Sequence, residues 1–453
     1  MRRARPHRGA GMRDRMLQLS STSALRQPPR AWWVLVAAFL LQLPLALNPG
    51  YFSHDELQWA AFAADGVPVR WDDLATFQYR PLTFTVWMAL SRALFDTPML
   101  FHAVLVAWGA GNAALLFLLG RGFCMRGWPA GLGSLGFALS PYATYVHGWV
   151  GCIADLIWLS CALAIGLLVQ RARRLALACV GAALLTLVAL LAKEAAFAIP
   201  PLLLVAWWFD RKPKWLAAML LSGMVAALYL VARLDALLDA PRQGAQYSLS
   251  LLHVPVRWFE YQVFPPVVPL LETFTVLQRP LPLAIAALLW LAMVASVFAA
   301  SRRLAALLLV GGIAALLPVL PLASSFNHYA YGFAAITAMA MAAAWPRASR
   351  SGRIAIGLFA VLSVLHGAFV MARMHEVGRI QAVFSPALAS AVQARGAIVL
   401  QLHPDAKEWV FRRLTHDIPH YRGVAIGPRV RIAAPGESAD VRVLPDGRLQ
   451  PLR

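Results

Sequence analysis

Residues 175–209 read LALACVGAALLTLVALLAKEAAFAIPPLLLVAWWF, an apolar run whose only charged residues are Lys193 and Glu194. A helix that crosses a bilayer needs about 20 consecutive apolar residues, because the hydrocarbon core is about 30 Å thick. The residues before Lys193 suffice for one crossing, and those after Glu194 supply a second, slightly short one. The pattern predicts two membrane helices with the Lys-Glu pair at the interface between them.

The rest of the chain has the same character. Of its 453 residues, 60% are hydrophobic and 14% are charged, whereas a soluble domain carries about 25% charged residues. The mean hydropathy is +0.62. We therefore expect an all-α polytopic membrane protein with about eleven transmembrane helices. The predicted spans are 31–47, 99–119, 130–147, 153–170, 175–191, 195–209, 215–232, 281–300, 304–322, 330–345 and 354–371.

Basic and acidic residues are distributed unequally between the two sides of the predicted membrane. The N-terminal tail 1–30 and five short loops hold 21 of the 41 basic residues but 2 of the 21 acidic ones. Cytoplasmic loops collect Lys and Arg, so this sorting predicts a cytoplasmic N-terminus and an extracytoplasmic C-terminus. The net charge of +20 then follows from the membrane topology, because the excess basic residues lie in the tail and the cytoplasmic loops. It suits contact with membrane lipids and gives no support to a nucleic-acid partner. The five loops are 120–128, 171–174, 210–214, 301–303 and 346–353.

Three domains follow from this topology. The tail 1–30 and the span after it predict an uncleaved signal-anchor, and residues 31–371 form the transmembrane domain. Its two long external loops are 48–98 and 234–280. Residues 372–453 predict a small extracytoplasmic α/β unit, because a helix-like stretch at 404–414 lies between strand-like stretches at 397–402 and 441–444.

The first external loop opens with YFSHDELQW at 51–59, which places Asp55 and Glu56 within a few residues of the first span. Sugar transfer to a hydroxyl needs a carboxylate that takes the acceptor's proton, and partial desolvation at a membrane surface raises a carboxylate pKa toward that task. Asp55 and Glu56 are therefore candidate catalytic carboxylates. A solvated acidic loop or a helix N-cap remains the alternative for both.

Two basic positions suit a lipid phosphate. Arg80 follows Tyr79 and precedes an apolar stretch, where its planar fork could hold phosphate oxygens. Lys193 could add its charge at the outer interface, oriented by Glu194. A snorkelling arginine and a structural salt bridge are the alternatives.

Further candidates lie at the outer ends of later spans. Asp155 begins a span, and His328, Tyr329 and Tyr331 lie between two others. All fall on the same predicted membrane face as the first loop, so they could line one cavity, although a helix cap and interfacial aromatic residues would give the same pattern. The chain contains no Walker loop, GxSxG elbow or HExxH motif.

This pattern resembles the GT-C superfamily of integral-membrane glycosyltransferases, which use polyprenyl-phosphate sugars and carry an acidic motif in the first external loop. Asp55 and Glu56 match that motif. The tetratricopeptide-repeat O-mannosyltransferases are similar in their membrane half, through residues 79–82, 192–194 and 329–331, although the repeats themselves are absent. The resemblance covers about residues 31–345.

The resemblance implies an inverting glycosyltransferase of a bacterial inner membrane. Its partners would be a polyprenyl-phosphate sugar donor and an acceptor glycan, lipid or protein. We expect Arg80 and Lys193 to hold the donor phosphate, with Glu194 orienting Lys193, and Asp55 to take the acceptor's proton. Glu56 and Asp155 would contact the acceptor or the sugar. The other candidate substrate-binding residues are Tyr79, His328, Tyr329 and Tyr331.

Two positions depart from the family pattern. The family tends to show Gly-Arg-Ala-Asp where this chain has Gly-Cys-Ile-Ala-Asp at 151–155, and an arginine before the tyrosine loop where this chain has His328. No cofactor is implied, and a divalent metal is left open. A transporter or flippase of lipid-linked sugars, and an inactive assembly protein, are the alternative functions.

Overall fold

The computed structural model describes residues 30–452 except 77, 239–246 and 435. The predicted basic tail 1–30, apart from Arg30, therefore lies outside the described residues, as does part of the second external loop. Among the described residues, six helical segments are long and apolar enough to cross a membrane. They are α6 (Pro98–Gly122), η1 with α9 (Val150–Arg171), α10 (Leu175–Ala192), α12 (Pro213–Leu238), α14 (Pro280–Ala300) and α18 (Arg350–Arg395).

The other predicted spans are also helical but broken or short. Pro44 and Pro141 lie in the first turns of two second segments, where the missing N–H of proline costs no helical hydrogen bond. The fold is thus an all-α multi-pass membrane protein, as predicted. These spans are α2 (Ala31–Leu41) with α3 (Leu43–Ala46), α7 (Gly127–Ala138) with α8 (Pro141–Gly148), α11 (Ile199–Asp210) after η2 (Glu194–Ala198), α15 (Arg302–Ala306) with η7 (Leu307–Gly311) and α16 (Gly312–Leu316), and α17 (Tyr331–Ala344) after η8 (Asn327–Ala330).

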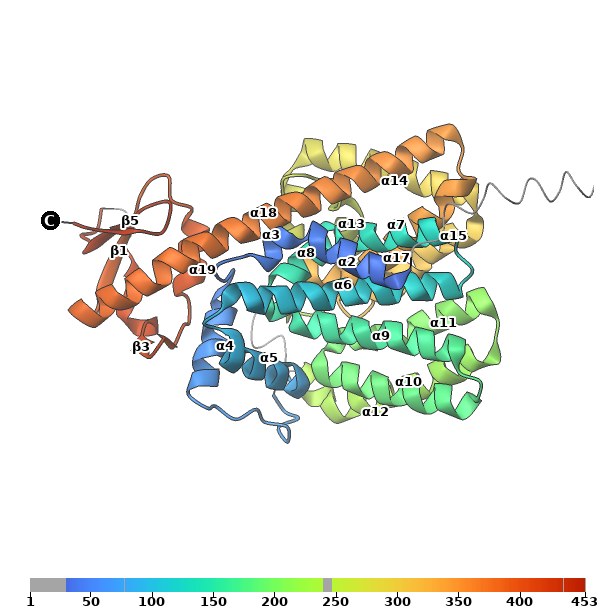
Figure 1. Ribbon diagram of the computed structural model, residues 1–453, viewed down its shortest axis with the longest axis horizontal. Coiled ribbons are helices and arrows are strands. Elements are labelled where there is room, and N and C mark those ends of the chain that lie inside the picture. Colours follow the sequence, from blue (N-terminus) through green and yellow to red (C-terminus); the bar gives the residue numbers. More distant parts are fainter. Residues whose placement is uncertain (1–29, 77, 239–246, 435, 453) are drawn as a thin grey trace, which may run out of the picture.

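The bundle has two chemically different ends (Figure 1). The turns that contain the five basic loops lie at one end, and α4 (His54–Ala64) and α5 (Pro81–Leu94) lie at the other, beside the C-terminal strands. The second external loop contributes η5 (Leu251–His253), α13 (Val254–Val263) and η6 (Thr273–Gln278), and η9 (Trp345–Arg347) belongs to the last basic loop.

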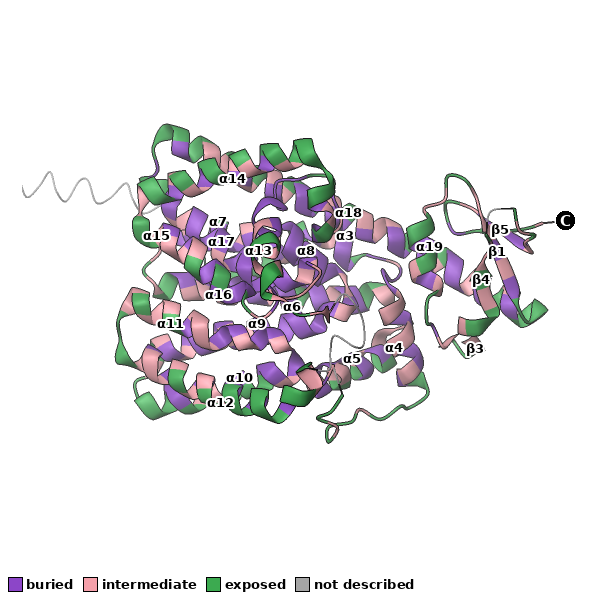
Figure 2. Ribbon diagram, turned by 180° about the vertical axis from the view of Figure 1, so that it is seen from behind, coloured by how far each residue is buried: buried purple, intermediate pink, exposed green. Residues whose placement is uncertain are grey.

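The outward faces of the bundle are apolar. Figure 2 shows exposed residues along the outer helices and buried residues where α8, α9 and α17 meet. Leu228 and Val231 of α12, and Leu281 and Leu288 of α14, are among the large exposed apolar side chains. So much exposed apolar surface suits contact with lipid rather than with water.

A small α/β unit follows the last membrane helix. The single helix α18 runs from the bundle into this unit. Its four-stranded sheet has the order β4-β1-β5-β6, with β1 parallel to β4 and to β5, and β6 antiparallel to β5. The helix-like and strand-like stretches predicted for this tail are present. The elements are β1 (Ile398–Leu402), α19 (Glu408–Thr415), the hairpin β2 (His420–Tyr421) and β3 (Val424–Ala425), η10 (Gly427–Arg429), β4 (Val430–Ile432), β5 (Val441–Val443) and β6 (Leu449–Pro451).

Candidate active site

The start of the first external loop is held against two membrane helices. The Asn48 side-chain amide donates to the carbonyl of Met374 at 3.3 Å, and Gln381 of α18 accepts from the Tyr51 N–H at 2.9 Å. His102 Nε2 of α6 lies 2.9 Å from the carbonyl of Gly50. These contacts fix where α4 begins, and therefore where Asp55 and Glu56 stand.

Glu56 is a buried anchor. Its carboxylate accepts from the backbone N–H groups of Phe52 (2.5 Å), Ser53 (2.7 Å) and Val150 (2.9 Å). The first two bonds satisfy N–H groups at the start of α4, as in a capping box, and the third joins the loop to η1. Burial raises the pKa of Glu56 to about 8, against the opposing effect of those N–H groups. Glu56 is therefore the N3 residue of a capping box whose N-cap is Ser53.

Asp55 has a different environment, although it is the next residue. Its side chain is 31% exposed, and it contacts His54 Nε2 at 3.2 Å and Ser53 Oγ at 3.3 Å. Burial lowers the pKa of His54, while Asp55 opposes that shift. Asp55 thus lies beside an imidazole and is partly exposed, so an acceptor hydroxyl can come within hydrogen-bond distance of its carboxylate.

Arg80 is paired with Glu194. The guanidinium donates from Nε at 2.9 Å, with Nη2 at 2.8 Å from the same carboxylate oxygen. The two residues meet because Thr83 in the first turn of α5 donates to the carbonyl of Ala192, the last residue of α10, at 2.8 Å. Both charged side chains remain about one-fifth exposed, so a ligand can reach them.

Lys193 is paired with Asp155 and not with its neighbour. The Nζ–Oδ2 distance is 2.5 Å, and both side chains are nearly inaccessible. The prediction that Glu194 orients Lys193 is therefore wrong. The cause is the extended backbone at Lys193, which turns successive side chains to opposite sides. Lys193 Nζ also lies 5.3 Å from the centre of the Tyr329 ring, within reach of a cation–π interaction.

Cys152, in η1, lies within electrostatic reach of several of these groups. Asp55, Glu56, Asp155 and Lys193 all act electrostatically on the thiol of Cys152. The acidic loop, the start of α9 and the end of α10 therefore surround one position. The site is built from segments that are far apart in sequence, and it lies at the end of the bundle that bears α4 and α5.

His328 lies among aromatic rings beside the two cations. Its ring contacts Tyr329, Phe326 and Trp149 at centroid distances of 4.3, 5.9 and 5.7 Å. Burial lowers the pKa of His328 well below its usual value, and Lys193 and Arg80 add to that effect. A neutral imidazole therefore occupies the place where the family resemblance implies an arginine.

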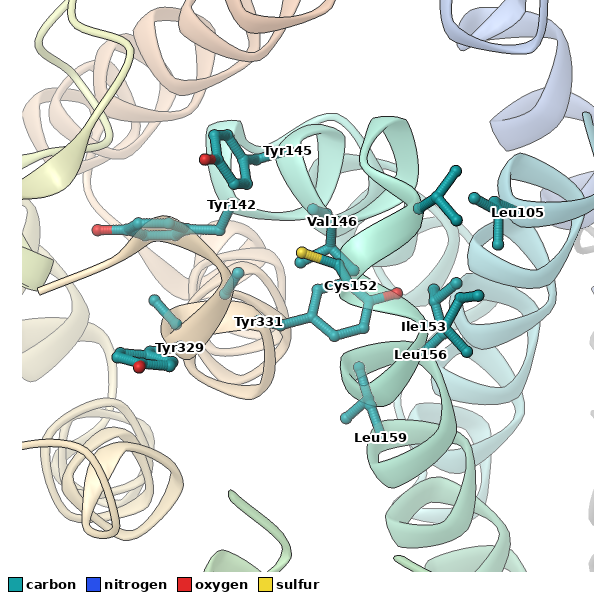
Figure 3. Packing of buried hydrophobic residues seen from close by; sticks show 14 of the residues in the cluster. Leu105, Tyr142, Tyr145, Val146, Cys152, Ile153, Leu156, Leu159, Tyr329 and Tyr331 are labelled. Atoms are coloured by element: carbon teal, nitrogen blue, oxygen red, sulfur yellow. The ribbon is translucent and has the colours of Figure 1, made fainter. Parts of the chain in front are cut away.

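Tyr329 and Tyr331 point in different directions (Figure 3). The Tyr331 hydroxyl lies 2.7 Å from His147 Nε2, and Asn112 donates to it at 3.4 Å. His147 Nδ1 lies 2.7 Å from the Gln42 side-chain oxygen. The Tyr331 hydroxyl thus bonds to a polar chain inside the bundle, although Asp155 also acts on it electrostatically.

Tyr79 also points away from the charged groups. Its hydroxyl donates to the carbonyl of Trp71 at 2.6 Å, and its ring lies under the Arg233 guanidinium at 5.1 Å. The residue holds the chain that leads into Arg80. Its side chain is therefore directed to Trp71 and Arg233, and its carbonyl accepts from the Tyr229 hydroxyl at 3.3 Å.

Sequence reasoning missed two residues next to the site. Glu272 of the second external loop and Arg413 of α19 lie 3.7 Å apart, and Arg413 acts electrostatically on His54 beside Asp55. No local pattern distinguished either residue, because neither follows a motif.

A divalent metal held by protein side chains would need several ligating groups in one place. Within the described ranges, no group of three or more His, Cys, Asp or Glu side chains could hold a metal ion. The described residues supply an accessible carboxylate, Asp55, and two paired cations, Arg80 and Lys193. This set can accept a proton and stabilise a leaving anion.

Fold and site together define a multi-pass membrane protein with a charged site at one end of its helix bundle. Two solved structures resemble it: ArnT from Cupriavidus metallidurans in the apo state (TM-score 0.49, 13% identity, 90% of this chain and 86% of that chain) and ArnT from the same organism bound to undecaprenyl phosphate (TM-score 0.48, 14% identity, 90% and 87%). A likeness of this degree does not assign a function. No family model and no curated protein matches the chain.

Proposed function

We propose that this protein is an integral-membrane glycosyltransferase that moves a sugar from a polyprenyl-phosphate donor to an acceptor hydroxyl on the extracytoplasmic face. The observation that carries the proposal is the accessible Asp55 carboxylate in the same site as the Arg80 and Lys193 ion pairs, at the end of the bundle away from the basic loops. The family resemblance of the sequence motifs supports the same class of reaction.

The donor phosphate would be held on the cation side of the site. Arg80 is the accessible cation, and its Nη1 has no bond to Glu194 among the described contacts, so it can donate to phosphate oxygens. Lys193 is buried and adds positive potential behind it. Glu194 and Asp155 hold the two cations in place.

The transfer would be a single in-line displacement with inversion. The acceptor oxygen forms a bond to the anomeric carbon, and the bond from that carbon to the phosphate oxygen breaks. Asp55 takes the acceptor's proton, and the electron pair leaves with the lipid phosphate. Cations already facing that oxygen lower the barrier, because they need no rearrangement as charge develops there.

The orientation follows from the charge sorting. The basic end of the bundle would face the cytoplasm of a bacterial inner membrane, which places the charged site, the C-terminal unit and the C-terminus outside. A polyprenyl chain would then lie along the apolar outer helices, with its phosphate at the level of Arg80.

The test uses the full chain in lipid nanodiscs. Undecaprenyl-phosphate sugars with different radiolabelled sugars serve as donors, and membranes from source cells that lack the gene serve as acceptors. Release of undecaprenyl phosphate is followed together with label transfer. Asp55→Asn should lower turnover by about 10²- to 10⁴-fold, the usual contribution of a general base.

The matched control is Asp73→Asn. Asp73 is also an acid of the first external loop, but its ion-pair partner is Arg70 at 3.6 Å. This variant should keep full turnover. Undiminished turnover in Asp55→Asn would remove the assignment of the base. An unmutated chain that turns over none of the donors, but moves them intact across a liposome membrane, would establish the flippase alternative.

A further inference from the structure

We infer that the C-terminal unit completes the site: Arg413 of α19, Glu272 of the second external loop and Trp149 before α9 form a subsite that binds a polyhydroxylated acceptor. This inference rests on the proposed function and extends it, because it assigns the acceptor side of the site and a role for the C-terminal unit.

The first observation is the position of Arg413. Its guanidinium carbon lies 4.4 Å from the centre of the Phe52 ring and 6.0 Å from that of Trp149. The residue lies 361 positions after Phe52 in sequence, yet only 23% of its side chain is exposed. A guanidinium over aromatic faces keeps its in-plane N–H groups free to donate.

The second observation is the loose pairing of this cation. The Arg413–Glu272 distance of 3.7 Å exceeds that of a charge-assisted hydrogen bond. The Glu272 oxygen involved also accepts from the Tyr145 hydroxyl at 3.2 Å. By contrast, the Arg80 and Lys193 pairs close at 2.8 and 2.5 Å. Arg413 can therefore turn toward a ligand without breaking a tight ion pair.

The third observation concerns polar atoms that lack partners. Across the part of the chain that the structure describes, Trp149 Nε1 and Glu272 Oε2 are buried without a hydrogen-bond partner. Leaving such atoms unpaired costs free energy, so each one calls for an explanation. One is a donor and the other an acceptor, and both belong to residues that adjoin Arg413. A ligand hydroxyl can pair with either atom, as acceptor for the indole N–H or as donor to the carboxylate.

The subsite lies on the Asp55 side of the site. The rings of His54 and His416 are 5.2 Å apart, so the end of α19 meets the start of α4. Asp55 also acts electrostatically on Arg413. A group held by Arg413, Glu272 and Trp149 would thus present a hydroxyl near Asp55, away from the Arg80 guanidinium. Aromatic faces with a few polar groups at their edges are suited to hydroxylated rings.

The plain alternative is that Arg413 only anchors the C-terminal unit. Other contacts already perform that task. Lys407 meets Glu376 of α18 at 2.5 Å, and Arg422 meets Asp96 at 2.8 Å. The Arg422 contact also borders a cavity of about 930 Å³ between α4, α5 and the β2–β3 hairpin. That cavity is the rival location for an acceptor.

The experiment compares transfer with hydrolysis in the nanodisc assay, using the donor that is turned over and the gene-deleted membranes as acceptor. Hydrolysis of the donor uses water in place of the acceptor and needs no acceptor subsite. Its rate therefore reports on donor binding and on the catalytic groups. Arg413→Ala should lower the ratio of transfer to hydrolysis about 10- to 100-fold, as for the loss of one or two charged hydrogen bonds. The KM for the donor should stay the same. Arg413→Lys keeps the charge but loses the planar guanidinium group. Its ratio of transfer to hydrolysis should lie between those of Arg413→Ala and the unmutated protein.

Lys407→Ala is the docking control, and it should leave the ratio unchanged. Thermal unfolding of each variant establishes that it is folded. An equal fall in Arg413→Ala and Lys407→Ala would make Arg413 an anchor only. A fall in Arg422→Ala without one in Arg413→Ala would move the acceptor to the other cavity. Either result overturns the inference but leaves the proposed function in place, whereas an unmutated chain that turns over no donor overturns both.

Discussion

Two buried polar regions of this protein differ in chemistry and in completeness. The interior region runs from Gln42 through His147 and Tyr331 to Asn112, and it consists of neutral groups that bond one another. The outer region is the candidate site around Asp55, Arg80 and Lys193. It consists of charged groups, and polar atoms without partners lie at its edge.

The interior region has one consistent hydrogen-bond direction. Gln42 donates through Nε2 to the carbonyl of Ala138 at 2.8 Å, so its oxygen faces His147 and accepts. His147 therefore carries its proton on Nδ1, and its Nε2 accepts from the Tyr331 hydroxyl. Gly109 permits this contact, since a Cβ there would lie 2.3 Å from His147 Nε2. A saturated network of this kind holds helices together and has no group left for a ligand.

The difference suggests a rule for this fold. Where polar groups inside the bundle are neutral and paired, substitutions should change stability alone. Where they are charged or lack partners, substitutions should change turnover. Substitutions in the two regions test that rule.

Lys193→Ala should have the largest effect on stability. It leaves the Asp155 carboxylate buried without its cation, and breaking a buried ion pair in this way costs about 3–5 kcal/mol. Thermal unfolding in nanodiscs measures the loss. The double variant Asp155→Asn with Lys193→Met removes both charges and should recover much of the stability but none of the turnover. Full activity in the double variant would contradict a role for Lys193 at the phosphate.

The neighbours Asp55 and Glu56 should separate stability from turnover. Glu56→Gln places an amide NH₂ opposite one of three backbone donors, so it should lower stability by about 1–3 kcal/mol. Asp55→Asn changes a partly exposed group and should stay within about 0.5 kcal/mol of the unmutated protein. Urea or thermal unfolding gives both values. A larger stability loss in Asp55→Asn than in Glu56→Gln would reverse the two assignments.

Glu56 should also make stability depend on pH. Its pKa in the folded protein is about 8, raised by burial above an ordinary 4.5. The folded state therefore holds a proton that the unfolded state has lost between these values, so stability should fall as pH rises from about 4.5 to 8. The slope should approach 1.4 kcal/mol per pH unit. In Glu56→Gln, the unfolding temperature should depend less on pH across this range. An unchanged pH dependence would mean that another group titrates.

The six long apolar helices could be predicted from sequence because a bilayer sets the length and polarity of a span, whereas the breaks in the other predicted spans could not. The position of Arg80 beside the 193–194 pair was also predictable, as all three residues flank spans on one face. The ion-pair partners were not, because the extended backbone at Lys193 turns its side chain toward Asp155. Arg413 was not predictable either, since its contacts with the first external loop depend on how the C-terminal unit packs.

The smallest expected effect belongs to the interior region. Tyr331→Phe removes the hydroxyl that donates to His147, which should lower stability by about 1–2 kcal/mol and leave turnover unchanged. Tyr329→Phe is the matched variant, because its ring faces Lys193 in the outer region and a phenylalanine ring keeps that contact. The unfolding temperature and the turnover are measured on both variants. A fall in turnover for Tyr331→Phe would join the interior network to the site, because a neutral side chain of the bundle would then affect the reaction through His147.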